Sequence, residues 1–539
     1  MNDIFKRLAQ FPTRLFVIVI GAGLFIPFLG HVHLFDWDEI NFAESAREML
    51  VSGNFHQVQI NFQPFFEKPP LFMWMQALCM HFLGTDEFSA RFPNAIFGIL
   101  TMLLTYNIGK HYFSVTFGVF WALLMACSFL PFFYFKSGII DPVFNYFIFL
   151  SLYWLFKISI KDEFESGKTL RKKMMRFTVY SAIACGLAVL TKGPVAILII
   201  VLVVTSVGVW NRGRITFNFS SFITWSIIVT LIISIWLSYE SQGIGVKFLK
   251  EFFYYQVRLF TTADAGHAGP IYYHFVILLL GCFPASILLW GAMKKNNEDT
   301  IHQLLLKRWM LALLSVVLIL FSITQTKIVH YSSLCYLPIT FLAAYYLHKV
   351  YEGKKKWHWG MTVGILVLAL LWAITIGGAM YIFSAKLTLP TINDLFAVEA
   401  LKAKVYWNSK ELVIPVLFLF LIIASIIAIH LNKKAIAIGI LLISSGLFAS
   451  LIALLMVPRV ERYSQNAMID FLKKASIEDC RFEARGFKSY AIYYYGQMSP
   501  TPTTNKTYII SKVNLISKID TTDLLPLYSK NGFVFFQKK

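Results

Sequence analysis

The chain has few charged residues for its length and no long polar stretch before residue 459. Asp, Glu, Lys and Arg make up 14% of its 539 residues, whereas an average soluble protein carries about 25%. Hydrophobic residues account for 57% of the chain. A water-exposed surface cannot be covered with so little charge, so the composition excludes a soluble globular enzyme and a disordered chain. It predicts a polytopic α-helical membrane protein.

Cysteine is scarce as well, and the spacing of the cysteines matches no metal-binding or disulfide motif. The six cysteines include no CxxC pair, which excludes a disulfide framework and a cysteine zinc site. Basic residues, in contrast, are in excess, with 49 Lys and Arg against 29 Asp and Glu. In a membrane protein such an excess is explained first by topology, because basic residues are concentrated in cytoplasmic loops. We therefore expect no nucleic-acid partner.

Apolar windows of about 20 residues predict about 13 transmembrane helices. The first follows Lys6, Arg7 and Arg14 without a small-residue cleavage site behind it, which predicts a retained span rather than a cleaved signal peptide. The predicted spans lie near residues 13–30, 92–109, 114–134, 142–158, 177–191, 194–210, 221–239, 271–292, 309–325, 328–347, 360–383, 412–431 and 435–457.

The basic loops between these spans all fall on one side, which the positive-inside rule makes cytoplasmic. The prediction is therefore a plasma-membrane protein with a cytoplasmic N-terminus and a transmembrane domain over residues 1–458. Short β-type runs separated by turns follow, and they predict a small outer α/β domain over 459–539. The outer side also receives longer segments at 31–91, which we expect to hold an interfacial helix, 240–270 and 384–411.

Two acidic positions on the outer side are candidates for catalysis. Asp38 and Glu39 follow the first span, and Asp141 precedes a proline between two apolar spans. Both positions are also typical of helix starts, where an Asp caps the backbone. Ionisable groups near a membrane nevertheless favour a functional role.

Cations are expected to be rare on the outer side, yet four separate ones fall there. Lys68 stands in FEKPP beside Glu67, and the others are Lys192 in LTKGP, Arg258 and Lys327. Each alone could be an interface anchor or a snorkelling side chain. Together they predict a pocket for an anionic head group such as a lipid-linked phosphate, whose departure they would stabilise. A carboxylate there could take a proton from an acceptor hydroxyl, and a single displacement would invert the anomeric centre.

The order of these motifs is similar to that of the bacterial lipid A aminoarabinose transferase family. DE…AESAREM, FEKP, a turn ending in DP, TKG, R…H…P..YY and K…Y follow one another from residue 36 to about 340. That family shares the C-type glycosyltransferase fold with the protein O-mannosyltransferases. The resemblance implies a periplasmic, inverting transfer of a sugar from a polyprenyl-phosphate carrier to lipid A, another envelope glycan or a protein, with membrane lipids as surroundings and no nucleotide cofactor.

The resemblance also implies roles for individual residues. Asp38 and Asp141 match the catalytic acidic positions, and Lys68 matches the lysine expected at the carrier phosphate. Glu67 and His267 match a pair implied as ligands for a divalent metal, by analogy zinc, although His267 without a metal would be an ordinary polar loop residue. The remaining matched positions are assigned to the phosphate (Lys192, Arg258, Lys327) or to the substrate pocket (Glu39, Tyr331).

One departure leaves the sugar open. Asn41-Phe42 stand where the aminoarabinose enzymes have Arg-Tyr after the DE pair. Two other functions also fit the sequence: a transporter or flippase of lipid-linked saccharides, and an inactive scaffold. A transporter is expected to show matched halves and polar features at mid-membrane, whereas here the ionisable residues gather at outer helix ends. That placement favours the enzyme.

Overall fold

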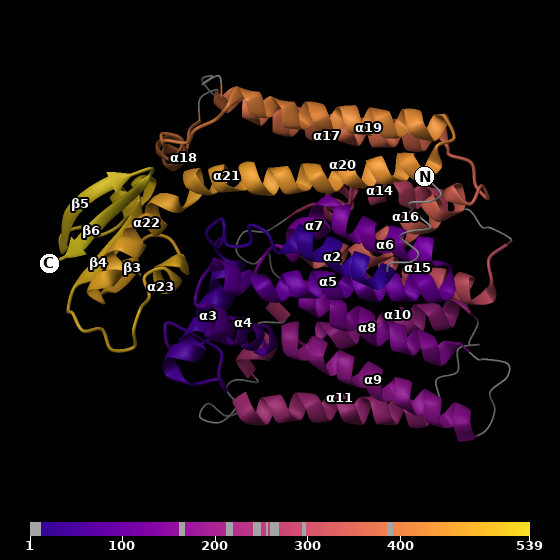
Figure 1. The fold of residues 1–539 in the computed structure, drawn as a ribbon. Coiled ribbons are helices and arrows are strands. Elements are labelled where there is room, and N and C mark those ends of the chain that lie inside the picture. Colours follow the sequence, from indigo (N-terminus) through magenta and orange to yellow (C-terminus); the bar gives the residue numbers. More distant parts are fainter. Residues whose placement is uncertain are drawn as a thin grey trace.

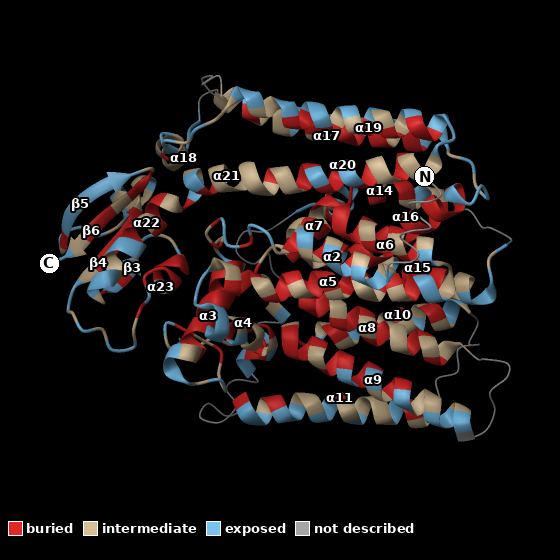
Figure 2. Cartoon of the chain, viewed as in Figure 1, coloured by how far each residue is buried: buried red, intermediate tan, exposed pale blue. Residues whose placement is uncertain are grey.

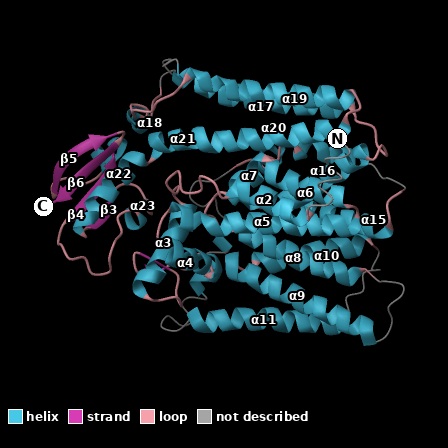
Figure 3. Cartoon of the chain, in the orientation of Figure 1, coloured by secondary structure: helices cyan, strands magenta, loops and turns pink. Residues whose placement is uncertain are grey.

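The computed structural model describes residues 12–160, 168–211, 219–240, 250–254, 257–258, 269–293, 298–384 and 392–539. Long helices run side by side as a bundle, and a small sheet domain lies at one end of it (Figure 1). Strands occur only there and in one short hairpin of the described chain (Figure 3).

The first half of the bundle is built from mostly apolar helices. In chain order the helices are α2 (Thr13–Phe25), α5 (Glu87–Tyr112), α6 (Val115–Cys127), α7 (Phe129–Phe135), α8 (Asp141–Ser159), α9 (Lys168–Lys192), α10 (Val195–Trp210) and α11 (Phe219–Glu240).

The second half continues with α13 (Tyr273–Gly281), α14 (Ala285–Leu288), η2 (Leu289–Ala292), α15 (Ile301–Ile323), η3 (Val329–Cys335), α16 (Tyr336–Tyr351), α17 (Trp359–Ser384), α18 (Leu395–Ala400), η4 (Ser409–Leu412), α19 (Val413–His430), α20 (Lys434–Leu455) and α21 (Val457–Ser464).

Eight helices of the described chain are long and apolar enough to cross a membrane, and ten if each of two bent pairs is one span. The bent pairs are α6 with α7, at 75°, and α13 with α14 and η2, at 111°. A polytopic helical membrane protein is thus confirmed, whereas the number thirteen stays a prediction. One predicted boundary is displaced, because residues 329–335 form a 3₁₀ segment and the following α-helix begins only at Tyr336.

Burial separates the central helices from the outer ones (Figure 2). α5, α8 and α9 are mostly buried, whereas α11 exposes large apolar side chains such as Phe222, Ile227 and Ile235. In a membrane protein such side chains face lipid, which is as apolar as they are.

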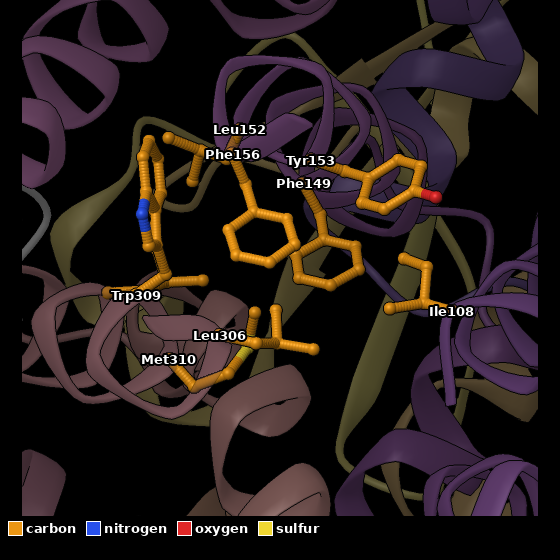
Figure 4. A pocket seen from close by; sticks show the side chains of 9 residues that line it. Ile108, Phe149, Leu152, Tyr153, Phe156, Leu306, Trp309 and Met310 are labelled. Carbon is orange, nitrogen blue, oxygen red and sulfur yellow. The ribbon is translucent and has the colours of Figure 1, made fainter. Parts of the chain in front are cut away.

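The central core leaves a small cavity of about 10 Å³ between α8 and α15. Figure 4 shows Phe149 and Phe156 of α8 opposite Leu306 and Met310 of α15. The lining is apolar and the space is no larger than one water molecule, so this cavity is a packing gap and not a substrate site.

At the end of the bundle that carries the sheet domain, the segment between α2 and α5 forms two helices and a hairpin. They are α3 (Asp38–Ser52), α4 (Leu71–Leu83), β1 (Gln59–Ile60) and β2 (Gln63–Pro64). α3 and α4 are packed against each other, with the Phe42 and Phe72 rings 5.9 Å apart. The basic turn between α19 and α20 lies at the opposite end of the bundle (Figure 1).

The chain ends in a four-stranded sheet of order β3-β4-β6-β5. β3 pairs with β4 in parallel, and the other neighbours are antiparallel. Phe471 of α22 stacks on Phe535 of β6, with ring centroids 4.3 Å apart, and so fixes the helix on the sheet. The elements are α22 (Asn466–Ala475), η5 (Ser476–Glu478), β3 (Arg481–Ala484), α23 (Ala491–Tyr494), β4 (Thr507–Lys512), η6 (Val513–Lys518), β5 (Leu524–Lys530) and β6 (Phe533–Lys538).

Candidate active site

Two of the predicted acids lie on either side of one histidine. Asp38 is the first residue of α3 and Asp141 the first residue of α8. Nε2 of His330, in η3, is 3.5 Å from Oδ2 of Asp38 and 4.0 Å from Oδ2 of Asp141. Segments about 100 and 190 residues apart in sequence therefore meet at one point.

The two carboxylates differ in exposure and in partners. The Asp38 side chain is 40% exposed, whereas the Asp141 side chain is 4% exposed. Lys192, the last residue of α9, donates from Nζ to Asp141 Oδ1, and its Nζ also lies 5.0 Å from the centre of the Tyr331 ring. Asp141, Lys192 and Tyr331 thus form a compact group, while Asp38 stays accessible to a substrate.

Glu39, predicted for the substrate pocket, is buried and bound by several groups of the protein. Arg91 of α5 donates to both of its carboxylate oxygens, from Nε at 2.9 Å and from Nη2 at 2.8 Å. The backbone N–H groups of Phe35 and Gly138 donate to the same carboxylate. Burial alone would raise the pKa of Glu39, but the Arg91 guanidinium and these hydrogen bonds outweigh it and lower the pKa.

This clamp explains why the acids meet. Glu39 is next to Asp38 and holds Gly138, three residues before Asp141. Asn94 of α5 holds the same turn by donating to the carbonyl groups of Ser137 and Ile139. The starts of α3 and α8 are therefore fixed to one helix.

Lys327 is committed to the protein backbone. Its Nζ donates to the carbonyl groups of Phe321, Ser322 and Thr324 at 3.1, 2.6 and 2.6 Å. An ammonium has three N–H groups, so all of them are used at the C-terminal end of α15, where a cation is favoured. The geometry thus favours helix capping for Lys327, and its predicted contact with a phosphate stays a prediction.

Lys68 lies near enough to His330 for an electrostatic interaction between them, and its place at the carrier phosphate stays a prediction. Arg258 is described only as part of residues 257–258, and its role stays a prediction. Glu67 lines a cleft towards the C-terminal domain. His267 lies outside the described residues.

The geometry of the described residues adds no support for the predicted metal site. Zinc takes three or four protein ligands, and within the described ranges no three His, Cys, Asp or Glu side chains form a group that could hold a metal ion. Glu67 and His267 therefore remain a predicted pair, and no step of the chemistry below depends on a metal.

The segment that leads into Asp38 is held by the C-terminal part of the chain. Backbone N–H of Leu34 donates to the Tyr495 hydroxyl at 2.7 Å, and Gln465 donates to the Leu34 carbonyl at 2.7 Å. Asp36 accepts from the backbone N–H of Tyr490 at 3.2 Å. Burial among these groups raises the pKa of Asp36, although the hydrogen bonds oppose the rise.

Sequence reasoning missed the roles of two residues. Arg91 is the last residue of the outer segment predicted at 31–91, directly before a predicted span, and the pattern does not show that it is buried against an acid. His330 directly precedes Tyr331, but the pattern alone does not show that it faces both acids.

The arrangement suits transfer from an anionic donor. Asp38 is an accessible carboxylate that can accept a proton, and His330 next to it can share or orient that proton. Lys68 and Lys192 provide positive charge for a phosphate. Asp141 is buried and bound to Lys192, so it positions this cation.

Comparison with known proteins gives relatives of one kind. The family model of dolichyl-phosphate-mannose-protein mannosyltransferases matches residues 13–247. An undecaprenyl phosphate-α-4-amino-4-deoxy-L-arabinose arabinosyl transferase of Shewanella sediminis is 26% identical over 345 residues, which are 63% of this chain and 60% of that protein. A transferase of the same description from Proteus mirabilis is 25% identical over 409 residues, 74% of this chain and 71% of that one.

The fold has a solved counterpart. The crystal structure of ArnT from Cupriavidus metallidurans bound to undecaprenyl phosphate superimposes with a TM-score of 0.76 and 17% sequence identity, over 97% of each chain. Its apo form gives a TM-score of 0.75. At this identity the match establishes a shared fold, which is the predicted membrane glycosyltransferase fold.

Proposed function

The chain is related to the bacterial aminoarabinose transferases and to the protein mannosyltransferases, as its motifs predicted, and from this we propose that it is a membrane glycosyltransferase. It takes a sugar from a polyprenyl-phosphate carrier, of which undecaprenyl phosphate is the bacterial form named for the relatives. The acceptor is an envelope molecule: lipid A, which the aminoarabinose relatives suggest, another glycan or a protein. The chain is a multi-pass protein of the bacterial inner membrane.

The observation that carries the proposal is the group formed by Asp38, His330, Asp141 and Lys192 at one end of the bundle. Asp38 takes the proton of the acceptor hydroxyl, whose oxygen attacks the anomeric carbon of the donor sugar. The bond from that carbon to the carrier phosphate breaks, and the phosphate leaves towards Lys68 and Lys192. The attack comes from the face opposite the phosphate, so the configuration inverts.

Sidedness supports a periplasmic reaction. The end with α3, α4 and the sheet domain carries the candidate site, while the basic turn at Lys433 and Lys434 lies at the other end (Figure 1). Because basic turns stay in the cytoplasm, the site faces the periplasm.

The test compares Asp38→Asn with the unaltered chain in a deletion strain. Mass spectrometry of envelope glycolipids and glycoproteins first identifies the product that the deletion removes. We expect the unaltered gene to restore this product and Asp38→Asn to restore less than a hundredth of it, with equal protein in the membrane. Full restoration by Asp38→Asn would contradict the assigned base.

A transporter makes a different prediction. Purified protein in liposomes would then move lipid-linked saccharide across the bilayer without releasing undecaprenyl phosphate. We expect release of undecaprenyl phosphate in step with product formation instead.

A further inference from the structure

A cleft of about 920 Å³ opens between the β1–β2 hairpin and the C-terminal domain. Its walls come from the segment 60–67 on one side and from β3, α23 and the loops around them on the other. The lining includes Phe62, Phe65, Glu67, Arg481, Phe487 and Tyr493.

The cleft offers both ring faces and hydrogen-bonding groups. Phe62, Phe65, Phe487 and Tyr493 line it and are each partly exposed. Such rings stack on the C–H faces of sugars, and the Gln63 amide and the Ser499 hydroxyl, which also line the cleft, are groups that bind sugar hydroxyls. Aromatic walls with a few polar groups are typical of sites for small organic ligands.

The charges in the cleft are balanced. Arg481 and Lys488 supply two cations, and Glu67 and Glu483 supply two carboxylates. Phosphate-rich head groups and acidic polymers are bound by an excess of cations. A balanced lining favours an uncharged or mixed-charge polar ligand, and among envelope molecules a saccharide fits this description.

The cleft borders the segments that carry the candidate active site. Tyr490 lines the cleft and meets the Trp37 ring edge to face at 5.7 Å, while Nζ of Lys488 lies 4.9 Å from the centres of both rings. Trp37 adjoins Asp38, and on the opposite wall Glu67 adjoins Lys68. The cleft is therefore separated from the proposed base by one neighbouring residue in sequence on this wall, which is the basis for linking the two.

We propose that this cleft binds the saccharide part of the acceptor and presents its hydroxyl group to Asp38. The inference rests on the proposed function, because it concerns the second substrate of the same reaction. It makes the hairpin and the C-terminal domain the parts that select the acceptor, whereas the membrane bundle binds the lipid carrier.

The test uses the full-length protein in nanodiscs of phosphatidylethanolamine and phosphatidylglycerol. A fluorescent oligosaccharide of neutral hexoses is the first probe, and a Ser/Thr-containing peptide of similar size is the second. We expect saturable binding of the oligosaccharide and at least tenfold weaker binding by Phe65→Ala and by Tyr493→Ala. Tyr528→Ala, which removes an exposed ring of β5 outside the cleft, is the control and should bind like the unaltered chain.

Undecaprenyl phosphate binding, measured in parallel, separates the two proposals. It should stay within twofold in all variants, which also shows that they are folded. No oligosaccharide binding, binding unchanged by both cleft variants, or cleft-dependent binding of the peptide instead would each overturn the inference. Failure of the unaltered chain to bind undecaprenyl phosphate would count against the proposed function, whatever the oligosaccharide does.

Discussion

Asp38 and Asp141 are each the first residue of a helix, yet their surroundings favour different roles. Asp141 is buried and bound to Lys192, whereas Asp38 is partly exposed and faces His330. A general base must reach its substrate before its proton affinity matters. Exposure therefore favours Asp38 as the proposed base and Asp141 as the residue that positions the cation.

His330→Gln should slow transfer at least tenfold, because the imidazole between the two acids holds them and shares the proton that Asp38 takes. The measurement is the rate at saturating donor over a range of pH, since loss of a titrating group should also change the pH profile. His358→Gln, at an exposed histidine, should behave like the unaltered chain. A rate and a profile unchanged in His330→Gln would remove the histidine from the mechanism.

Single residues also show the limit of sequence reasoning. The sequence places Lys327 among cations of the outer side, but only the structure shows its ammonium facing three carbonyl groups at the end of α15. A lysine that caps a helix and a lysine that binds phosphate look alike in a pattern, because the difference is the direction of a flexible side chain.

At the scale of elements, α3 carries its own buried charge network. Arg47 donates to both carboxylate oxygens of Glu44 at 2.7 Å and to the Met498 carbonyl at 3.0 Å, which joins α3 to the C-terminal domain. Glu48 accepts from the backbone N–H of Phe62 at 2.8 Å and so holds the hairpin. The helix that starts with Asp38 thus supports both walls of the cleft.

Glu48→Gln should make stability less dependent on pH. Burial, followed by the nearby Glu44 carboxylate, raises the pKa of Glu48 to about 8. The folded chain therefore binds a proton that the unfolded chain has lost, and stability contributed by this group falls as pH rises from about 4.5 towards 8. We expect the titration of Glu48 to lower the apparent melting temperature by about 2 °C between pH 5 and 8. This decrease should be absent in the Glu48→Gln variant.

The check is a thermal melt in detergent at several pH values, with transfer activity as the readout of folding. Glu478→Gln, at a carboxylate on the surface of the C-terminal domain, is the matched control. An equal slope in the Glu48→Gln variant and the unaltered chain would contradict the raised pKa.

Element boundaries were predicted well where hydropathy decides them. The segments at 142–158 and 435–457 coincide with α8 and α20, because a long apolar run has few alternatives to a helix in lipid. The break at Ser128 between α6 and α7 lies inside one predicted apolar span, and composition cannot locate it. The meeting of α3 and α8 could not be predicted either, because it depends on the buried Glu39–Arg91 pair.

For the whole molecule, the distribution of charge predicts its orientation. Reporter fusions test it: a fluorescent protein that folds only in the cytoplasm should light up at the N-terminus, and alkaline phosphatase, active only in the periplasm, should be active at the C-terminus. A fusion of each reporter at the turn near Asn432 serves as the control, since this basic turn should be cytoplasmic. Phosphatase activity at that turn would reverse the orientation and place the site in the cytoplasm.

The hydrogen bonds between the C-terminal part of the chain and residues 33–36 have a consequence for biogenesis. The segment before Asp38 enters the membrane early in synthesis, but its partners Gln465, Tyr490 and Tyr495 come more than 400 residues later. Since chains fold from the N-terminus as they are made, the segment before Asp38 reaches its final partners only after the C-terminal part of the chain has been synthesised. A chain truncated before Gln465 therefore lacks the contacts that fix this segment, even when its helices are inserted.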